Sequence, residues 1–204
     1  MIMKLASGSP LFTKKIGLIL SKILKSGDIL LLDGELGAGK TTFISGIAEG
    51  LGIKENLSSP SFTIINLYEI GSRKKFIHAD FYRLDNVDEI LDIGIPDYLY
   101  GSRNIACIEW GDKIKGFLSS NYLEAKFEYF YPPGGRDPTA GYDTGHSAGH
   151  STGHIAGYTA DSDSNSDLEK RLVSFSSPAA GSRWDRKLKI FKKLLERQKC
   201  IFLE

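Results

Sequence analysis

Cysteine and long apolar runs are nearly absent from this chain of 204 residues. Its two cysteines, Cys107 and Cys200, lie in different contexts and lack a C-x-x-C spacing, which argues against a disulfide framework and against a zinc site. No segment approaches the roughly 18 consecutive apolar residues of a membrane span, and residues 1–6 lack the apolar core of a signal peptide. We therefore expect a cytoplasmic protein that does not insert into a membrane.

A strong excess of one charge is also missing, because 26 lysines and arginines face 25 aspartates and glutamates, for a formal net charge of +1. This balance argues against a nucleic-acid clamp that uses the whole molecule, although it is compatible with a local basic patch. Hydrophobic residues make up 41% of the chain, which is enough to bury one ordinary core. We expect a single domain over residues 1–204.

A phosphate-binding loop is present in residues 34–42, which read GELGAGKTT. An apolar run precedes it and a helical pattern follows it, and in this setting the spacing G-x-x-x-x-G-K-[ST] lets backbone N–H groups and a helix N-terminus face phosphate oxygens. A glycine-rich turn alone would explain Gly37 and Gly39 but not Lys40, which would reach the β- and γ-phosphates, or Thr41, which would ligate Mg²⁺. The predicted nucleotide-binding residues are Glu35, Leu36, Gly37, Ala38, Gly39, Lys40, Thr41 and Thr42.

The rest of the hydrophobic pattern predicts alternating helices and strands. A helix begins with Ser9 as N-cap and Pro10 at its first position and continues to Gly27, a buried strand follows at 29–32, and the helix after the loop stops at Gly50 or Gly52. Further strands are predicted at 64–68, 76–80, 104–109, 123–131 and 171–175, and further helices from 86, over 95–99 and near the C-terminus. This order predicts an α/β fold of the P-loop NTPase type, with three layers and a mixed, partly parallel central sheet flanked by helices.

Two of the predicted strands end in a carboxylate, Asp80 and Glu109. Ligands of open α/β sheets bind outside the carboxyl ends of the strands, so both acids are candidates to hold Mg²⁺ or to position the attacking water. Either acid could instead cap a helix or pair with Arg83, but the neighbouring P-loop favours the functional interpretation. The hydroxyls of Ser59, Ser61 and Thr63, by contrast, are explained locally by ordinary turn chemistry.

Residues 132–167 differ from the rest of the chain, because they contain five tandem tetrapeptides that begin with glycine and then a Ser/Asp-rich run. His146, His150 and His154 would share one face of a helix and so suggest a metal site. A glycine at every fourth position makes that helix costly, by about 0.8–1 kcal/mol per glycine relative to alanine. We expect a flexible, solvated insertion.

The C-terminal helix carries an apolar side with Trp184, Leu188, Phe191 and Leu195. Its many cations predict a solvated face, with nucleic acid or an acidic partner as the alternative. They include Lys187, Lys189, Lys192, Lys193 and Arg197.

Four blocks of this sequence together resemble the TsaE (YjeE) family, the small P-loop ATPases of bacterial N6-threonylcarbamoyladenosine tRNA modification. They are the P-loop, SPSFT at 59–63, HADFYRL at 78–84 and IEW at 108–110. The resemblance extends from about residue 9 to about residue 131. The P-loop alone is shared with many NTPases, whereas the other three blocks together are specific to the family.

The resemblance implies an ATPase that acts with the TsaB–TsaD pair, in which TsaD transfers the threonylcarbamoyl group to adenosine 37 of ANN-decoding tRNAs, so tRNA would be met through that complex. It also implies that Lys40 binds phosphate, that Thr41 and Glu109 ligate Mg²⁺, that Asp80 supports hydrolysis, and that residues 59–63 act as a switch. Lys40, Asp80 and Glu109 are thus the predicted catalytic residues.

Two features depart from the family pattern. Glu35 replaces the usual Asp in the P-loop, which should matter little, and the Gly/His repeat leaves open the pairing of the C-terminal strand and any role of Arg136 or Arg171 near the nucleotide. No motif places an arginine finger, so we expect weak turnover by the chain alone. A small-molecule kinase, for which we find no Arg-rich lid, and a nucleotide-dependent scaffold are the alternative functions.

Overall fold

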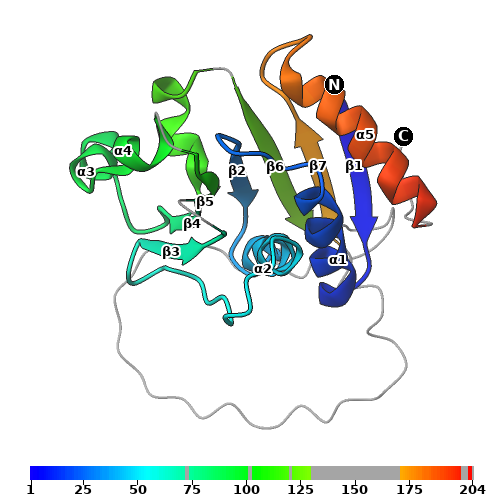
Figure 1. The fold of residues 1–204 in the computed structure, drawn as a ribbon, viewed down its shortest axis with the longest axis horizontal. Coiled ribbons are helices and arrows are strands. Elements are labelled where there is room, and N and C mark those ends of the chain that lie inside the picture. The colour runs from blue at the N-terminus through cyan, green and yellow to red at the C-terminus, as the bar shows by residue number, and fades with distance from the viewer. Residues whose placement is uncertain (72–73, 101–102, 120, 130–170, 199–201, 204) are drawn as a thin grey trace, which may run out of the picture.

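A sheet of eight strands in the order β3-β4-β5-β2-β6-β7-β1-β8 forms the centre of the molecule (Figure 1). The computed structural model describes residues 1–71, 74–100, 103–119, 121–129, 171–198 and 202–203. The strands are β1 (Ile2–Ser7), β2 (Ile29–Gly34), β3 (Ile65–Glu69), β4 (Lys75–Asp80), β5 (Ile105–Glu109), β6 (Tyr122–Tyr129), β7 (Arg171–Ser176) and β8 (Phe202–Leu203). The helices are α1 (Pro10–Ser21), α2 (Lys40–Gly50), α3 (Val87–Asp92), α4 (Ile95–Leu99), the 3₁₀ helix η1 (Gly111–Phe117) and α5 (Arg183–Arg197).

The middle of the sheet is parallel and its borders are antiparallel. Strands β4, β5, β2 and β6 run in the same direction, whereas β3 is antiparallel to β4, β7 to β6, and β1 to both β7 and β8. The predicted mixed, partly parallel sheet is therefore confirmed, and so is the strand expected at 171–175, which pairs with β6. In this arrangement the carboxyl ends of β2, β4 and β5 meet at one edge of the sheet.

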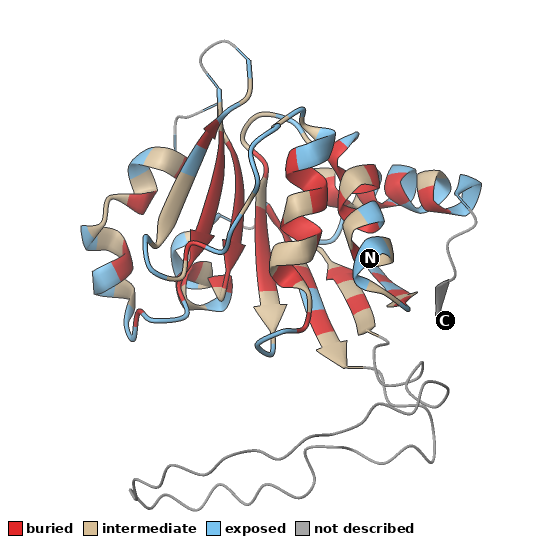
Figure 2. Ribbon diagram, turned by 90° about the horizontal axis from the view of Figure 1, so that it is seen from below, coloured by how far each residue is buried: buried red, intermediate tan, exposed pale blue. Residues whose placement is uncertain are grey.

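Helices cover both faces of the sheet, which gives the three layers that the sequence predicts. Leu30 and Leu32 of β2 pack with residues of α1, α2 and α5 in one core cluster, and Leu31 packs with residues of α3, α4 and η1 in the other. Figure 2 shows the central strands buried along most of their length, between helices whose outer sides are exposed. A continuously apolar strand such as β2 is what burial on both faces requires.

Helix α1 begins as predicted but ends earlier. The Ser9 hydroxyl accepts a hydrogen bond from the Phe12 N–H at 3.1 Å, and Pro10 is the first helical residue. The predicted end at Gly27 is wrong, because the helix stops at Ser21 and the next turns use shorter-range bonds such as Leu24 N–H to Ser21 O, at 3.1 Å. Gly27 instead takes a left-handed φ of 81° in the turn before β2 and donates its N–H to Asn104 O.

Helices α1 and α2 cross at very short distance because glycines lie at the contact. A Cβ added to Gly17 would come within 2.1 Å of Phe43 O, and one added to Gly46 within 1.9 Å of Lys14 O. The helix after the loop ends as predicted, with Gly50 as its last residue and Gly52 at a φ of 86° just beyond it. The crossing holds α1 against the helix that starts at the P-loop.

Strand β1, near the N-terminus, is not predicted from the sequence. The insertion at 132–167, with His146, His150 and His154, lies outside the described residues, as does Arg136. Within the described residues, no helix combines the length and the apolar character needed to cross a bilayer.

The apolar side of α5 is buried as predicted, with Trp184, Leu188, Phe191 and Leu195 all at 0% exposure. The assignment of Lys187 to a solvated face is wrong, because this side chain is buried and pairs with the fully buried Asp28. A cation can sit beneath the surface here because the α1–β2 turn supplies its counter-charge.

Candidate functional site

The P-loop joins β2 to α2 at the carboxyl edge of the sheet and owes its path to glycines. A Cβ on Gly34 would lie 2.1 Å from Phe127 O, so only glycine fits where β2 leaves the sheet beside β6. Gly39 has a φ of 101° and forms the N-cap of α2 without a side-chain cap. Its carbonyl accepts the first helical bond, from Phe43 N–H at 2.9 Å. The first N–H groups of α2 have no partner within the helix by geometry, so this terminus is suited to bind an anion.

The Lys40 side chain is hydrogen-bonded to backbone carbonyls of the P-loop itself. Its ammonium donates to Gly34 O at 2.6 Å and to Glu35 O at 2.8 Å, and it lies 4.7 Å from the centre of the Trp110 ring. Burial lowers the pKa of Lys40, while the nearby carboxylates of Glu109 and Asp80 oppose that shift. The ammonium is thus held at the centre of the loop, where a further negative group would stabilise its charge.

Thr41 and Glu109, the two predicted magnesium ligands, are in direct contact. The Thr41 hydroxyl donates to Glu109 Oε1 at 2.8 Å, and His78 Nε2 lies 2.9 Å from the same oxygen. His78 and Glu109 are both buried, Glu109 as the last residue of β5 and His78 on the neighbouring strand β4, two residues before its end. The sequence includes His78 in a family block, but no local pattern gives it a role, because its contact with Glu109 depends on how β4 pairs with β5.

Asp80 lies beside Glu109 in the register of β4 and β5 but has a different set of partners. Its Oδ2 accepts hydrogen bonds from Ser59 Oγ at 2.8 Å and Ser61 Oγ at 2.7 Å, and its Oδ1 accepts one from Tyr82 N–H at 3.0 Å. The alternative that Asp80 pairs with Arg83 does not hold, since the Arg83 guanidinium stacks over Phe62 at 4.3 Å. The serine hydroxyls therefore do more than local turn chemistry, because they connect residues 59–61 to the site.

Aromatic side chains border the site. Trp110 follows Glu109 with a left-handed φ of 58°, and its ring packs against Tyr82 with the centroids 5.2 Å apart. Phe62 is 83% exposed and Leu36 is 73% exposed. A non-glycine residue at positive φ is strained, so the turn that presents the Trp110 ring is held by its surroundings.

A hollow of about 260 Å³ brings most of the predicted residues together. It is lined by Leu36, Gly37, Gly39, Lys40, Thr41, Thr42, Ser59, Ser61, Asp80, Glu109 and Trp110. Glu35 and Ala38 do not line it, since the Glu35 side chain is exposed and Ala38 is buried beneath the loop. Arg171 lies outside it and stacks over Tyr129, whose hydroxyl donates to Leu36 O at 3.2 Å. Of the described residues, no arginine lines this hollow.

The oxygen donors of the hollow fit a hard divalent cation held together with a nucleotide. The described residues contain no cluster of three His, Cys, Asp or Glu side chains that could hold a metal without further ligands. Thr41 and Glu109 instead supply a hydroxyl and a carboxylate, which is the usual protein share of a Mg²⁺ site completed by phosphates and water. Cys107, opposite His78 in the sheet, is buried, and this burial together with the charge of Glu109 raises the pKa of its thiol well above its ordinary value.

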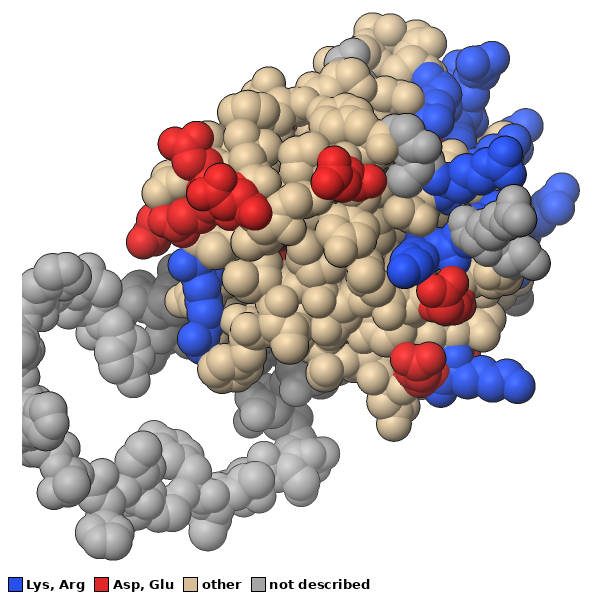
Figure 3. Space-filling model, turned by 60° about the vertical axis from the view of Figure 1, so that its left-hand side comes forward, with Lys and Arg blue, Asp and Glu red and all other residues tan. Residues whose placement is uncertain are grey.

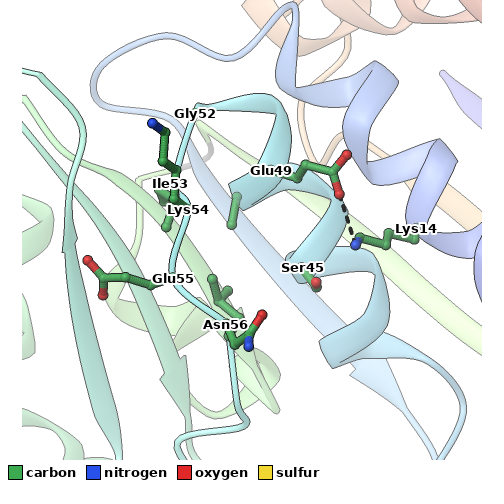
Figure 4. A pocket seen from close by; sticks show the side chains of 10 residues that line it. Lys14, Ser45, Glu49, Gly52, Ile53, Lys54, Glu55 and Asn56 are labelled. Carbon is green, nitrogen blue, oxygen red and sulfur yellow. Dashed lines mark ion pairs between the residues drawn. The ribbon is translucent and has the colours of Figure 1, made fainter.

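A second hollow of about 440 Å³ lies between the end of α2 and residues 53–57 (Figure 4). The Lys14–Glu49 ion pair, at 2.8 Å, bridges α1 and α2 at its border. None of the predicted catalytic, nucleotide-binding or metal-binding residues lines this second hollow. The predicted site residues therefore gather at the P-loop hollow and not here.

Comparisons with known proteins show which proteins this chain resembles. Residues 8–131 match the family model described as threonylcarbamoyl adenosine biosynthesis protein TsaE, which agrees with the extent of the resemblance predicted from the motifs. The chain is 38% identical over 116 residues to the tRNA threonylcarbamoyladenosine biosynthesis protein TsaE of Treponema pallidum, which covers 57% of this chain and 84% of that protein. The protein of the same name from Bacillus subtilis is 41% identical over 116 residues, covering 57% and 71%.

The fold is similar to that of a solved structure. The crystal structure described as Bacillus subtilus YdiB matches with a TM-score of 0.60 and 26% sequence identity, covering 97% of each chain. This likeness includes the strands and helix that follow the insertion, which the family model does not reach.

Proposed function

Since the chain belongs to the TsaE family of threonylcarbamoyl adenosine biosynthesis proteins, we propose that it is an ATPase that binds ATP with Mg²⁺ at the P-loop. Hydrolysis there would support threonylcarbamoyl transfer to adenosine 37 of ANN-decoding tRNAs by a TsaB–TsaD complex in the cytoplasm, and tRNA would be met through that complex. One observation carries the proposal: Lys40, Thr41, Asp80 and Glu109 come from three separate segments and line a single hollow.

Phosphate binding is supported by the loop and by the start of α2. The N–H groups that open α2 would face the polyphosphate of a bound nucleotide, and the helix dipole favours its negative charge. When ATP binds, the Lys40 ammonium would stop donating to the two loop carbonyls and donate to β- and γ-phosphate oxygens instead. The ammonium would then have negatively charged acceptors and would still lie within the loop. Charge-assisted hydrogen bonds are roughly twice as strong as neutral ones, which favours the exchange.

Thr41 and Glu109 would hold Mg²⁺, which supplies neutralisation of the phosphate charge when bound. The Thr41 hydroxyl and Glu109 Oε1 already lie 2.8 Å apart, and the contact with His78 fixes the direction of the carboxylate. Outer partners of this kind orient a ligand so that little entropy is lost when the metal binds.

Asp80 would orient the attacking water. Ser59 and Ser61 hold its Oδ2, and the backbone N–H of Tyr82 holds its Oδ1, so the carboxylate is fixed and retains lone pairs to accept a hydrogen bond from water. The water oxygen attacks the γ-phosphorus, the bond to the β–γ bridging oxygen breaks, and ADP leaves with that electron pair. The proton of the water ends on the phosphate products.

Turnover by the chain alone should be slow, because no described arginine lines the hollow. A group supplied by a partner is worth about 10³–10⁵ in rate in well-studied P-loop enzymes. Residues 59–63 and Trp110 lie at the rim of the hollow, so they are the segments best placed to transmit the presence of ATP to the TsaB–TsaD complex.

The test is the ATPase rate of the chain with and without purified TsaB–TsaD, together with pull-downs in ATP, in ADP and without nucleotide. We expect ATP to strengthen the complex and the complex to accelerate hydrolysis. Lys40→Ala is the matched negative control, because it should remove ATP binding, measured by calorimetry, while the melting temperature stays unchanged. Equal nucleotide affinity in Lys40→Ala would refute the P-loop site. An ATPase rate that TsaB–TsaD does not change, together with TsaB–TsaD binding that nucleotide does not change, would refute the coupling.

A further inference from the structure

A third hollow, with a very different lining, lies between residues 22–26, just after α1, and the first half of α5. Its volume is about 640 Å³, and five of the residues that line it are cations: Lys22, Lys25, Arg183, Arg186 and Lys187. Ser26, Ile23 and Ile190 complete the lining, so no acidic side chain borders it. We call these five cations the α1–α5 basic face.

One buried anion fixes part of this face. The carboxylate of Asp28 pairs with Lys187 and lies 3.1 Å from the Arg183 guanidinium, which also donates to Gly27 O at 2.7 Å. Asp28 is fully buried, so its negative charge faces these two cations and not the solvent. Lys22, Lys25 and Arg186 are exposed, and the face as a whole carries five positive charges against one negative charge.

Acidic residues nearby are engaged elsewhere. Asp185, in the first turn of α5, lies 3.1 Å from the amino terminus of Met1 and accepts the Gly181 N–H at 2.6 Å. Burial lowers the pKa of Lys187, and although Asp28 opposes this shift, the positive charges of Arg183 and Lys25 add to it. The cations of the face therefore repel one another, and an anion in the hollow would relieve that repulsion.

The positive charge extends beyond the hollow along α5. With helical spacing, Lys193 and Arg197 continue the flank that holds Arg183, Arg186 and Ile190, and both are exposed. In Figure 3, lysine and arginine side chains are concentrated on the right-hand side of the view, with acidic side chains among the lower ones, and a separate group of acidic side chains lies at the left. A row of cations about 20 Å long, at 1.5 Å per helical residue, fits a polymer of anions better than a single small ion.

We propose that the α1–α5 basic face binds the phosphate backbone of RNA. Arginine and lysine side chains on α5 and on the turn after α1 supply the sequence-independent contacts on which RNA affinity largely depends. The proposal rests on the family's place in tRNA modification and on this charge pattern, and it does not require ATP hydrolysis. The face surrounds the turn before β2, whereas the P-loop follows β2, so about 20 Å of strand separates the two sites. RNA can thus be held while the nucleotide hollow stays open to ATP and to a protein partner.

The test measures binding of a fluorescein-labelled, unmodified transcript of an ANN-decoding tRNA to the full chain by fluorescence anisotropy, without nucleotide, from about 50 to 200 mM KCl. The variant Lys22→Gln/Lys25→Gln/Arg186→Gln removes three exposed cations and leaves the Asp28 pairs intact. The matched control, Lys15→Gln/Lys54→Gln/Lys74→Gln, removes three exposed cations that lie outside the face. Melting temperature and basal ATPase rate should equal those of the wild type in both variants.

We expect the wild-type chain to bind the transcript with a dissociation constant of about 1–100 μM at moderate salt. The face variant should bind at least about 10-fold more weakly, and its slope of log affinity against log salt should be smaller by about 2–3. The control should change affinity by less than about twofold. Equal weakening by the two triple variants, or the absence of wild-type binding, would overturn the proposal.

A competitor separates RNA from an acidic protein as the occupant. Polyglutamate of matched charge should displace the transcript much less effectively than unlabelled tRNA. If polyglutamate competed equally well, the face would be assigned to an acidic protein and the RNA proposal would fail. A chain that bound RNA but hydrolysed no ATP would retain this site and lose only the proposed function.

Discussion

At the scale of single residues, the two carboxylates at the strand ends differ in what already touches them. Glu109 Oε1 contacts the hydroxyl of Thr41 and the imidazole of His78, and these two contacts keep the carboxylate directed at Thr41. Asp80 is held by a different set of groups, two serine hydroxyls and a backbone N–H. The neighbours thus give the two acids different tasks, although the strands place them side by side.

The first prediction follows from this difference. Glu109→Gln should raise the Mg²⁺ concentration needed for half-maximal ATPase activity, because an amide is a poorer ligand for a hard cation. Asp80→Asn should lower the hydrolysis rate more than it lowers ATP affinity. Activity against Mg²⁺ concentration and calorimetry with ATP measure the two effects, and if they were reversed, the roles of the two residues would have to be exchanged.

The second prediction concerns His78, which contacts Glu109 from below the site. His78→Ala should weaken Mg²⁺-dependent nucleotide binding by about 10–100-fold, the range measured for outer partners of metal ligands. Fluorescence of a labelled ATP analogue, titrated with Mg²⁺, reports this without need of turnover. Cys107→Ala is the control, since it alters the buried residue opposite His78 without removing a hydrogen bond to Glu109. Similar losses in both variants would reduce His78 to a packing residue.

Single residues also show how far the sequence can be interpreted. Lys40, Thr41 and Gly39 are predicted because the P-loop concentrates its chemistry within nine consecutive residues. The contacts of Ser59 and Ser61 with Asp80 are not predicted by local rules, since they join residues about twenty positions apart. From the sequence, only the family resemblance assigns that segment a role.

At the scale of elements, the crossing of α1 and α2 holds the P-loop helix in place. Gly17 and Gly46 allow the two backbones to touch, and the ion pair between Lys14 and Glu49 lies at the border of the same contact. The N-terminus of α2 can be positioned precisely for phosphate binding only if the rest of the helix is fixed. Here α1 fixes it through backbone contact.

The third prediction tests that crossing. Gly46→Ala would place a Cβ 1.9 Å from Lys14 O, so the helices must separate, at a cost of about 1–3 kcal/mol or more. Urea unfolding should show a lower midpoint. Gly116→Ala in η1 is the matched control, because its Cβ would meet nothing within 4 Å and should leave the midpoint nearly unchanged. An unchanged midpoint in Gly46→Ala would mean that the crossing is looser than its geometry implies.

Elements differ in how well the sequence predicts them, for a physical reason. The cap at Ser9 and the buried run of β2 depend on neighbouring residues and are predicted. The end of α1 is not, because Gly27 is a turn glycine bonded to Asn104, far along the chain. Strand β1 is defined by its pairing with β7 rather than by a local pattern.

At the scale of the whole molecule, residues 132–167 interrupt the chain between the family-matched region and the strand that completes the sheet. Their Gly, Ser, Asp and His content offers little apolar surface against an ordering cost of about 1–2 kcal/mol per residue. This composition argues that the fold and the nucleotide site do not depend on them.

The fourth prediction is that replacing residues 132–167 by a short Gly-Ser linker leaves the melting temperature and the ATPase rate nearly unchanged. Differential scanning calorimetry and a phosphate-release assay check the two quantities. A linker of the same length with the Gly/His repeat scrambled separates composition from order. A large loss of stability or activity with the short linker would show that the insertion packs against the domain or takes part in its work.

The pairing of β1 with β7 also determines when the sheet can be completed as the chain is synthesised. Residues 2–7 leave the ribosome well before residues 171–176, the strand with which they pair along their whole length. At about 5–20 residues per second, the nascent chain waits roughly 10–30 s for that partner. During this interval Met3 and Leu5, which the finished sheet buries, have no strand beside them. The sheet therefore closes late, and a chain released before residue 171 would carry an open strand edge that other nascent chains could join.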